Sequence, residues 1–221
     1  MNLKFYEESL ARHGLASTVY YGLYRCANRL TDAALWNILV LTMDRVDRRL
    51  LDEACVEEVT AETLRPFVGK GNTLTHEFLD QATARGDRCF AVFWAGRLAS
   101  YAWYAHRPTP LLTLGEDVVL RFDPRWAYLH NGFTHPLHRG LRLYPMQLAM
   151  ALKTLTAEGR EGLISYVASS NFAAMKAARG MGFEQVGRFA AIRVGGQVRG
   201  KFLGGCDAYG LRLEQPGSRA A

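Results

Sequence analysis

Short runs of β-forming residues alternate with segments of helical periodicity from residue 75 onward, and this alternation constrains the fold more than any other feature. Apolar and aromatic runs predict four strands, over Arg88–Trp94, Arg97–His106, Trp126–Thr134 and Gly162–Ala168. Apolar residues at helical spacing predict three helices, over Thr75–Arg85, Tyr144–Glu158 and Asn171–Met181. Strands and helices in this order predict an α/β or α+β fold, in which helices pack on the faces of a sheet.

Glycines punctuate these elements. Gly86 and Gly182 follow two of the predicted helices, and glycine commonly ends a helix. Ala95-Gly96 separates the first two strands and predicts a hairpin. Residues 184–213 are strand-like, and Gly195-Gly196 predicts a second hairpin turn there.

The first part of the chain has a different pattern. Residues 4–44 are predicted to form two helices, the second over Ala33–Met43 with Thr31 or Asp32 as its N-cap. A strand is predicted within residues 50–60 and a short helix over Ala61–Val68. We therefore divide the chain into an N-terminal helical extension (1–45), a main domain (46–215) and a flexible C-terminal tail (216–221).

The composition is that of a globular protein rather than of a disordered or membrane-spanning chain. Of 221 residues, 49% are hydrophobic and 22% are charged. No apolar run reaches the roughly 18 residues of a membrane span, and the N-terminus lacks the pattern of a secretory signal. The cysteines are scattered, without a CxxC pair, at Cys26, Cys55, Cys89 and Cys206. Neither a disulfide framework nor a zinc site is expected. The cysteines are instead consistent with a protein of the reducing cytoplasm.

The positive charge suggests a nucleic-acid partner, and the histidines suggest a metal ion. The formal net charge is +6, but the sequence shows no zinc-finger spacing and no RNP signature, so a nucleic-acid partner is not expected. His130, His135 and His138 are close in sequence, like metal ligands. Pro136 and the extended pattern around these histidines argue against that reading, and no metal is expected.

One segment has the features of an anion site. Phe133–Tyr144 (FTHPLHRGLRLY) runs from a strand through Pro136 into a basic loop and a helix. Unpaired N–H groups at a helix N-terminus and the helix dipole both favour an anion. Arg139, Arg142 and His138 add positive charge, and arginine binds phosphate in a bidentate manner. The segment therefore predicts a site for a pyrophosphate.

A second segment follows at a fixed distance. Val167–Ala174 (VASSNFAA) places Ala174 three residues after Asn171, and Gly182-Phe183 follow that asparagine at eleven and twelve residues. Together with the basic loop, this spacing resembles the GNAT superfamily of acyl-CoA-dependent N-acyltransferases. The resemblance covers residues 126–183. It implies a mixed, mostly antiparallel central sheet with helices on both faces, and an acyl-CoA donor such as acetyl-CoA.

The resemblance also implies which residues contact the donor, namely Phe133, Thr134, His135, His138, Arg139, Gly140, Leu141, Arg142, Leu143, Tyr144, Asn171 and Ala174. Asn171 is equally suited to cap the helix that it begins. Arg142 and Tyr144 stand where the family loop has small residues, which leaves open an acyl group delivered on a carrier protein.

The sequence offers several candidates for the catalytic acid and one for the base. Many family members have a tyrosine seven residues after the asparagine, as the acid for the leaving thiolate, but this chain has Ala178 there. Tyr166 and Tyr144 are the candidate substitutes, and protonation by water is the third option. His130 is the candidate base, because a histidine titrates near pH 6.5 and an alkyl ammonium only near pH 10. Aralkylamine N-acetyltransferases have a base-relay histidine at a similar place, while a buried histidine bonded to a backbone carbonyl is the alternative.

The carbonyl of the donor would be polarised by backbone N–H groups near Phe133–His135, and Asn131-Gly132 is compatible with a bulge that frees them. The leading function is transfer of an acyl group, acetyl first, from acyl-CoA to a primary amine of a small molecule. Transfer of a longer chain from acyl carrier protein and a non-catalytic acyl-CoA-binding module are the alternatives. For residues 1–45 a lid, a homodimer contact, a carrier-protein dock and a peripheral membrane contact stay open.

Overall fold

The computed structural model describes residues 10, 14–22, 33–51, 55–111, 113–115, 117–194 and 197–215. Its strands are β1 (Ala33–Leu41), β2 (Val56–Val59), β3 (Arg88–Trp94), β4 (Arg97–Ala105), β5 (Thr109–Pro110), β6 (Val119–Arg121), β7 (Trp126–Thr134), β8 (Gly162–Ala168), β9 (Glu184–Val194), β10 (Gln197–Gly204) and β11 (Arg212–Glu214). Its helices include α2 (Ala61–Leu64), α3 (His76–Arg85), α4 (Leu143–Ala157) and α5 (Phe172–Gly180), with short 3₁₀ turns η1 (Met43–Arg45), η2 (Arg48–Leu51), η3 (Arg65–Phe67), η4 (Pro136–His138) and η5 (Gly205–Tyr209). Residues 14–22 are also helical.

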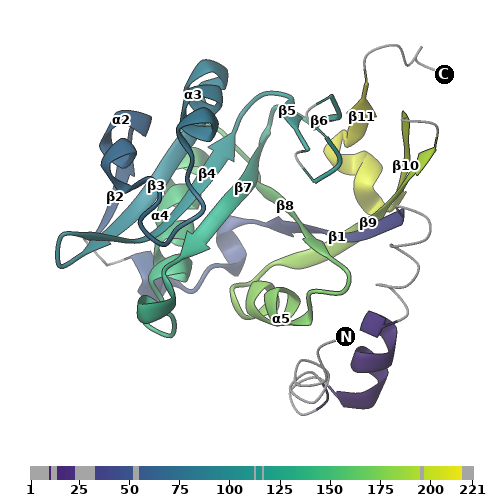
Figure 1. The fold of residues 1–221 in the computed structure, drawn as a ribbon, viewed down its shortest axis with the longest axis horizontal. Coiled ribbons are helices and arrows are strands. Elements are labelled where there is room, and N and C mark those ends of the chain that lie inside the picture. Colours follow the sequence, from purple (N-terminus) through teal and green to yellow (C-terminus); the bar gives the residue numbers. More distant parts are fainter. Residues whose placement is uncertain are drawn as a thin grey trace.

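One large twisted sheet organises the described part of the chain (Figure 1). Its eight strands lie in the order β10-β9-β1-β8-β7-β4-β3-β2, and β5, β6 and β11 form a smaller sheet. Within the described residues, every pairing in the large sheet is antiparallel except that of β7 with β8. The mostly antiparallel mixed sheet predicted from the sequence is confirmed.

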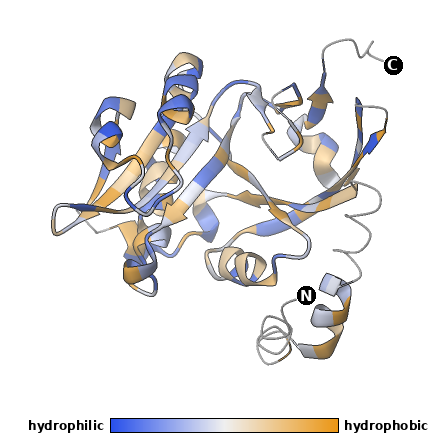
Figure 2. Ribbon diagram, in the orientation of Figure 1, coloured by the Kyte–Doolittle hydropathy of each residue, from blue (hydrophilic) through white to orange (hydrophobic). Residues whose placement is uncertain are grey.

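Helices cover both faces, as predicted. On one face α4 and α5 bury apolar side chains such as Leu148, Leu152 and Met175 against the sheet. On the other face α2 and α3 cover the β2–β4 half through Leu64 and Leu79. Figure 2 shows the hydrophobic positions of these elements along the sheet. The smaller sheet and η5 pack on the remaining half of that face.

Most predicted elements are confirmed, several of them to the residue. β3, β7 and β8 have the predicted bounds, and α3 is capped by the Thr75 side chain and ends at Gly86, whose φ is +73°. The hairpin of β9 with β10 flanks Gly195-Gly196, which lie outside the described residues. The predicted C-terminal tail also lies outside them.

The helix predicted over Ala33–Met43 is wrong, because these residues form strand β1 and the turn that follows it. β1 lies between β8 and β9, and from Trp36 onward its side chains are buried on both faces of the sheet. A strand buried on both faces is a continuous apolar run, and periodicity alone does not distinguish it from a buried helix. The sheet therefore begins at Ala33, and the predicted division at residue 45 does not follow it. Residues 14–22 are helical as predicted.

Candidate active site

The two parallel strands separate near the middle of the sheet. β7 pairs with β8 only from Trp126–Tyr128 to Gly162–Ile164, and beyond these residues the ladder stops. Figure 1 shows the two arrows diverging above α5. The Ser165 hydroxyl donates to the Leu129 carbonyl oxygen at 3.2 Å. Just beyond the end of the backbone ladder, a side-chain hydrogen bond therefore connects the two strands. Among the described residues, no strand pairs with this edge of β7 beyond this point.

The predicted bulge is present on the other edge of β7. Tyr101 of β4 pairs with Phe133 and Trp103 pairs with His130, so Asn131 and Gly132 together face a single β4 residue. Asn131 has a φ of +42°, in the left-handed region. Two residues against one define a β-bulge, which bends the strand and leaves backbone groups unpaired.

A groove of about 910 Å³ opens between the end of β7, the start of α4, and α5. Seven of the residues predicted to contact the donor line this groove, namely Phe133, Thr134, Arg139, Arg142, Tyr144, Asn171 and Ala174. The structure thus brings together two motifs that the sequence separates by more than twenty residues.

The other predicted donor contacts lie elsewhere. His135 and His138 line a separate cavity, on the other side of the loop. Gly140 and Leu141 are exposed in the loop. Leu143 is buried in the core with Val92. Leu143 can therefore offer the groove only its backbone N–H.

The loop before α4 is arranged to accept an anion. Arg142 is the N-cap residue and has a φ of +59°, the left-handed conformation that glycine usually adopts. No side chain caps the helix and no acidic residue lies in its first turn. The N–H groups of Leu143 and Tyr144 have no partner within the helix, because the first helical bond runs from Met146 N to Arg142 O. Within the described residues, neither Arg139 nor Arg142 forms an ion pair with a carboxylate.

The start of α5 forms the opposite wall. The Asn171 side-chain oxygen accepts the backbone N–H of Ala174 at 3.0 Å, which confirms the predicted N-cap. Ala178 is only 5% exposed and packs in the core. The position that carries a tyrosine in many members of the resembled superfamily therefore places no acid in this groove.

Tyr144 does place a hydroxyl there. A Cβ atom on Gly132 would lie 2.4 Å from the Tyr144 hydroxyl oxygen, so this oxygen lies against the bulge. Burial raises the pKa of Tyr144 to about 12, and the phenol stays protonated at neutral pH. Of the two candidate acids, Tyr144 is the one that lines the groove.

His130 has a carboxylate partner that the sequence analysis missed. Its Nε2 atom lies 3.3 Å from Oδ2 of Asp87, whose side chain is only 1% exposed. Arg85 contacts the same carboxylate oxygen at 2.7 Å. A buried carboxylate beside a histidine favours one orientation of the ring. Asp87 gave no signal in the sequence, since it stands alone after a helix and far from His130.

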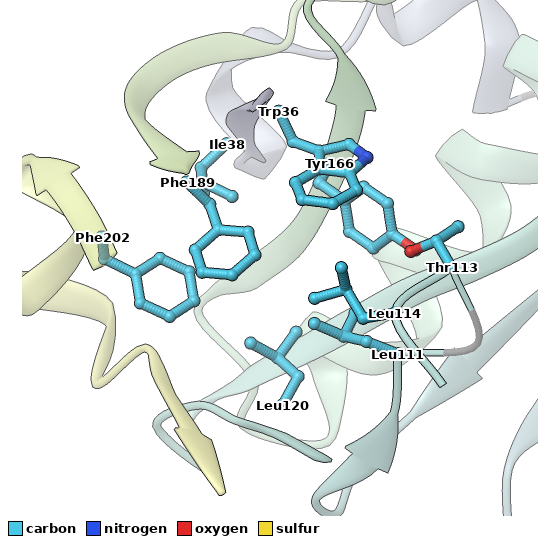
Figure 3. Close-up of a pocket in the computed structure, with 9 residues that line it drawn as sticks. All are labelled: Trp36, Ile38, Leu111, Thr113, Leu114, Leu120, Tyr166, Phe189 and Phe202. Atoms are coloured by element: carbon cyan, nitrogen blue, oxygen red, sulfur yellow. The ribbon is translucent and has the colours of Figure 1, made fainter. Parts of the chain in front are cut away.

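Tyr166 lies on the face of the sheet opposite α5. Its hydroxyl is 3.2 Å from the Thr113 hydroxyl, and its ring is stacked on Tyr128, with 6.1 Å between centroids. Tyr128 is in turn stacked on His130 at 5.5 Å. Figure 3 shows Tyr166 in an apolar pocket with Trp36 and Phe189. This pocket has a volume of about 10 Å³, too small for a substrate.

Gln147, on α4 one turn beyond Tyr144, is fully buried, and its amide faces the buried Tyr104 hydroxyl without a hydrogen bond of normal geometry. An unpaired buried polar group costs about 1–3 kcal/mol, while an apolar group of the same shape costs nothing comparable. We expect Gln147→Met to raise the free energy of unfolding by about 1 kcal/mol, measured by urea denaturation. The matched control is Gln185→Met, because the Gln185 amide donates to Asn37 Oδ1 at 3.0 Å and its loss should destabilise the protein. Equal destabilisation by both substitutions would show that Gln147 is paired.

Among the described residues no group of three or more histidine, cysteine or acidic side chains could hold a metal ion. None of the described helices is long and apolar enough to cross a membrane.

Comparisons with known proteins show the fold. No family model and no curated protein matches the sequence. Among solved structures, the chain is similar to an acetyltransferase from the GNAT family from Colwellia psychrerythraea, with 17% identity, 72% of this chain and 55% of that chain covered, and a TM-score of 0.51. A ribosomal-protein-alanine N-acetyltransferase from Brucella melitensis has 16% identity, with 67% of this chain and 99% of that chain covered and a TM-score of 0.42. The chain spans little more than half the length of the Colwellia protein.

Proposed function

We propose that this chain, which has the fold of the GNAT superfamily, transfers an acyl group from acyl-CoA to a primary amine by direct attack on the thioester. One observation carries the proposal. The groove at the separation of β7 and β8 runs from the bulge to a cationic, uncapped helix start. It offers a phosphate site at one end and free backbone amides at the other.

The residues of the groove fit such a donor. Arg139, Arg142 and the N–H groups at the start of α4 would hold its phosphates, since within the described residues neither arginine forms an ion pair with a carboxylate. The bound thioester supplies the activated carbonyl. Backbone N–H groups at the Asn131–Phe133 bulge would donate to a developing oxyanion.

Two side chains handle the protons. An alkyl ammonium has a pKa of about 10, so the amine must lose a proton before it attacks. His130, held by Asp87, accepts this proton. Tyr144 keeps a proton on its hydroxyl at neutral pH and lies in the groove, where it can donate to the leaving thiolate. Acetyl is the acyl group we expect first.

Removing the loop arginines tests the phosphate site. We expect Arg139→Gln and Arg142→Gln each to weaken CoA binding about tenfold, because a hydrogen bond from a charged group is worth about 1.5–3 kcal/mol. Isothermal titration with CoA measures the dissociation constant. A higher salt concentration should reduce the difference in CoA affinity between each variant and the wild type, because salt screens the charge of the arginine. Arg199→Gln on β10 is the control for loss of one positive charge. Unchanged affinity in both loop variants would place the phosphates elsewhere.

A donor carried by acyl carrier protein is a second candidate, and one observation favours it. Leu137 is 75% exposed and Leu141 49% exposed in the same loop as Arg139 and Arg142. Exposed apolar side chains among cations suit an acidic protein surface. Rates of transfer from acetyl-CoA and from acyl-loaded carrier protein separate the two donors. A chain that binds CoA but acylates no amine would instead be a non-catalytic binding module.

A further inference from the structure

A second cavity, of about 360 Å³, lies on the other side of the loop that follows β7. Its walls come from three segments that are distant in sequence: the loop after η3 with Lys70 and Asn72, the β3–β4 hairpin with Arg97, and His135 with His138. None of its lining residues lines the donor groove. The loop is thus a wall between two cavities.

The polar side chains of this cavity are mainly hydrogen-bond donors. Lys70 and Arg97 contribute an ammonium and a guanidinium, and neither forms an ion pair with a carboxylate among the described residues. His135 Nδ1 accepts the backbone N–H of Leu137 at 3.3 Å, so the proton of the neutral ring is on Nε2. In the part of the chain that the structure describes, no acidic residue lines the cavity. Such a set of groups favours a carboxylate or a phosphate.

The loop that carries Lys70 is held in place. The Asn72 amide donates to the Phe67 carbonyl oxygen at 2.8 Å, and its side-chain oxygen accepts the backbone N–H of Leu74 at 2.9 Å. Gly71 lies beside His135, and an added Cβ would be in ordinary van der Waals contact with Nε2, at 3.4 Å. The backbone therefore fixes the shape of the cavity, and only the ends of the long cationic side chains are free to adjust.

The same loop reaches the face of the sheet that carries the proposed base. The Thr73 hydroxyl donates to Asn131 Oδ1 at 3.2 Å and accepts from the Tyr101 hydroxyl at 2.7 Å. Asn131 belongs to the bulge and is adjacent to His130 in the chain. The cavity and His130 thus lie on one side of the loop that follows β7, and the donor groove lies on the other side.

We propose that the acceptor amine also carries an anionic group, a carboxylate or a phosphate, which binds between Lys70, Arg97 and His135. The inference rests on the proposed acyl transfer and specifies its substrate class. The anionic group of the acceptor is held in the cavity, and its amine extends along the loop that follows β7 toward His130. The cavity then selects acceptors by charge.

Matched acceptors test this on the full chain with acetyl-CoA as donor. The pairs are glutamate with glutamine, phosphoethanolamine with ethanolamine, and diglycine with diglycinamide, and products are measured by mass spectrometry. We expect the anionic member of at least one pair to have a kcat/KM at least tenfold higher. The double substitution Lys70→Gln with Arg97→Gln should remove this preference by raising the KM for the anionic acceptor. The KM for acetyl-CoA and the rate with the neutral acceptor should stay unchanged. Arg199→Gln with Lys201→Gln on β10 is the control.

Several results would overturn the inference and spare the proposed function. Equal kcat/KM values within every pair would do so, and so would a double variant that raises the KM for acetyl-CoA, which would assign the cavity to the donor. Binding of CoA without transfer to any acceptor, anionic or neutral, would instead indicate a non-catalytic binding module and reject the transfer on which the inference rests. Failure of the wild-type chain to bind CoA in a separate titration would instead reject the proposed function itself.

Discussion

Replacement of His130 by alanine is expected to lower kcat about 100-fold with an amine acceptor and saturating acetyl-CoA, because general base catalysis contributes about 10²–10⁴-fold. The ring nitrogen that faces Asp87 is buried, and the side chain as a whole is 12% exposed. One ring nitrogen therefore faces the Asp87 carboxylate, and only a small part of the imidazole reaches solvent. A steady-state assay across pH 6–9 measures the loss.

A structural role for His130 would give a different result. His76→Ala removes an exposed histidine from α3 and should leave kcat unchanged. Added imidazole should restore part of the activity of His130→Ala, since a small base can enter the vacated space. Asp87→Asn should also lower kcat, because the amide cannot stabilise a protonated ring as a carboxylate does. Normal kcat in a folded His130→Ala protein would reduce this histidine to a packing residue.

Replacement of Gly132 by alanine is expected to lower kcat/KM by at least tenfold and to destabilise the protein by about 1–3 kcal/mol, the usual range for an overpacked site. The new Cβ would meet the Tyr144 hydroxyl at 2.4 Å and its ring at 2.9 Å. The tyrosine must then move into the groove or away from the bulge, and either movement disturbs donor binding. Enzyme kinetics and urea denaturation measure the two effects.

The matched control is Gly180→Ala, because no atom lies within 4 Å of the position of its Cβ and alanine favours a helix. This variant should be at least as stable as wild type. The double variant Gly132→Ala with Tyr144→Ala should regain stability relative to the sum of its single substitutions. Strict additivity would show that Gly132 and Tyr144 do not compete for the same space.

The parts of the fold that could be predicted depend on local chemistry. Asn171 caps α5 through Ala174, three residues away, and Gly182 has a φ of +94° just after the helix. Pro136 and Gly140 likewise shape the loop before α4 from within a few residues. Each of these features depends on neighbours in sequence, and a motif can report it.

The features that could not be predicted depend on distant contacts. β1 is a strand because β8 and β9 pair with its two edges, and nothing within residues 33–41 reveals those partners. Asp87 comes to His130 only through the pairing of β3 with β4 and of β4 with β7. The opposite placement of Tyr166 and Tyr144 also follows from the sheet, since β8 points Tyr166 away from α5.

A crystal structure of the full chain with CoA tests the central claim most directly. We predict the pyrophosphate against the N–H groups of Leu143 and Tyr144, with Arg139 and Arg142 beside it, and the sulfur near the bulge at Asn131–Phe133. CoA bound elsewhere than between this loop and Asn171 would contradict the site and the function that is built on it.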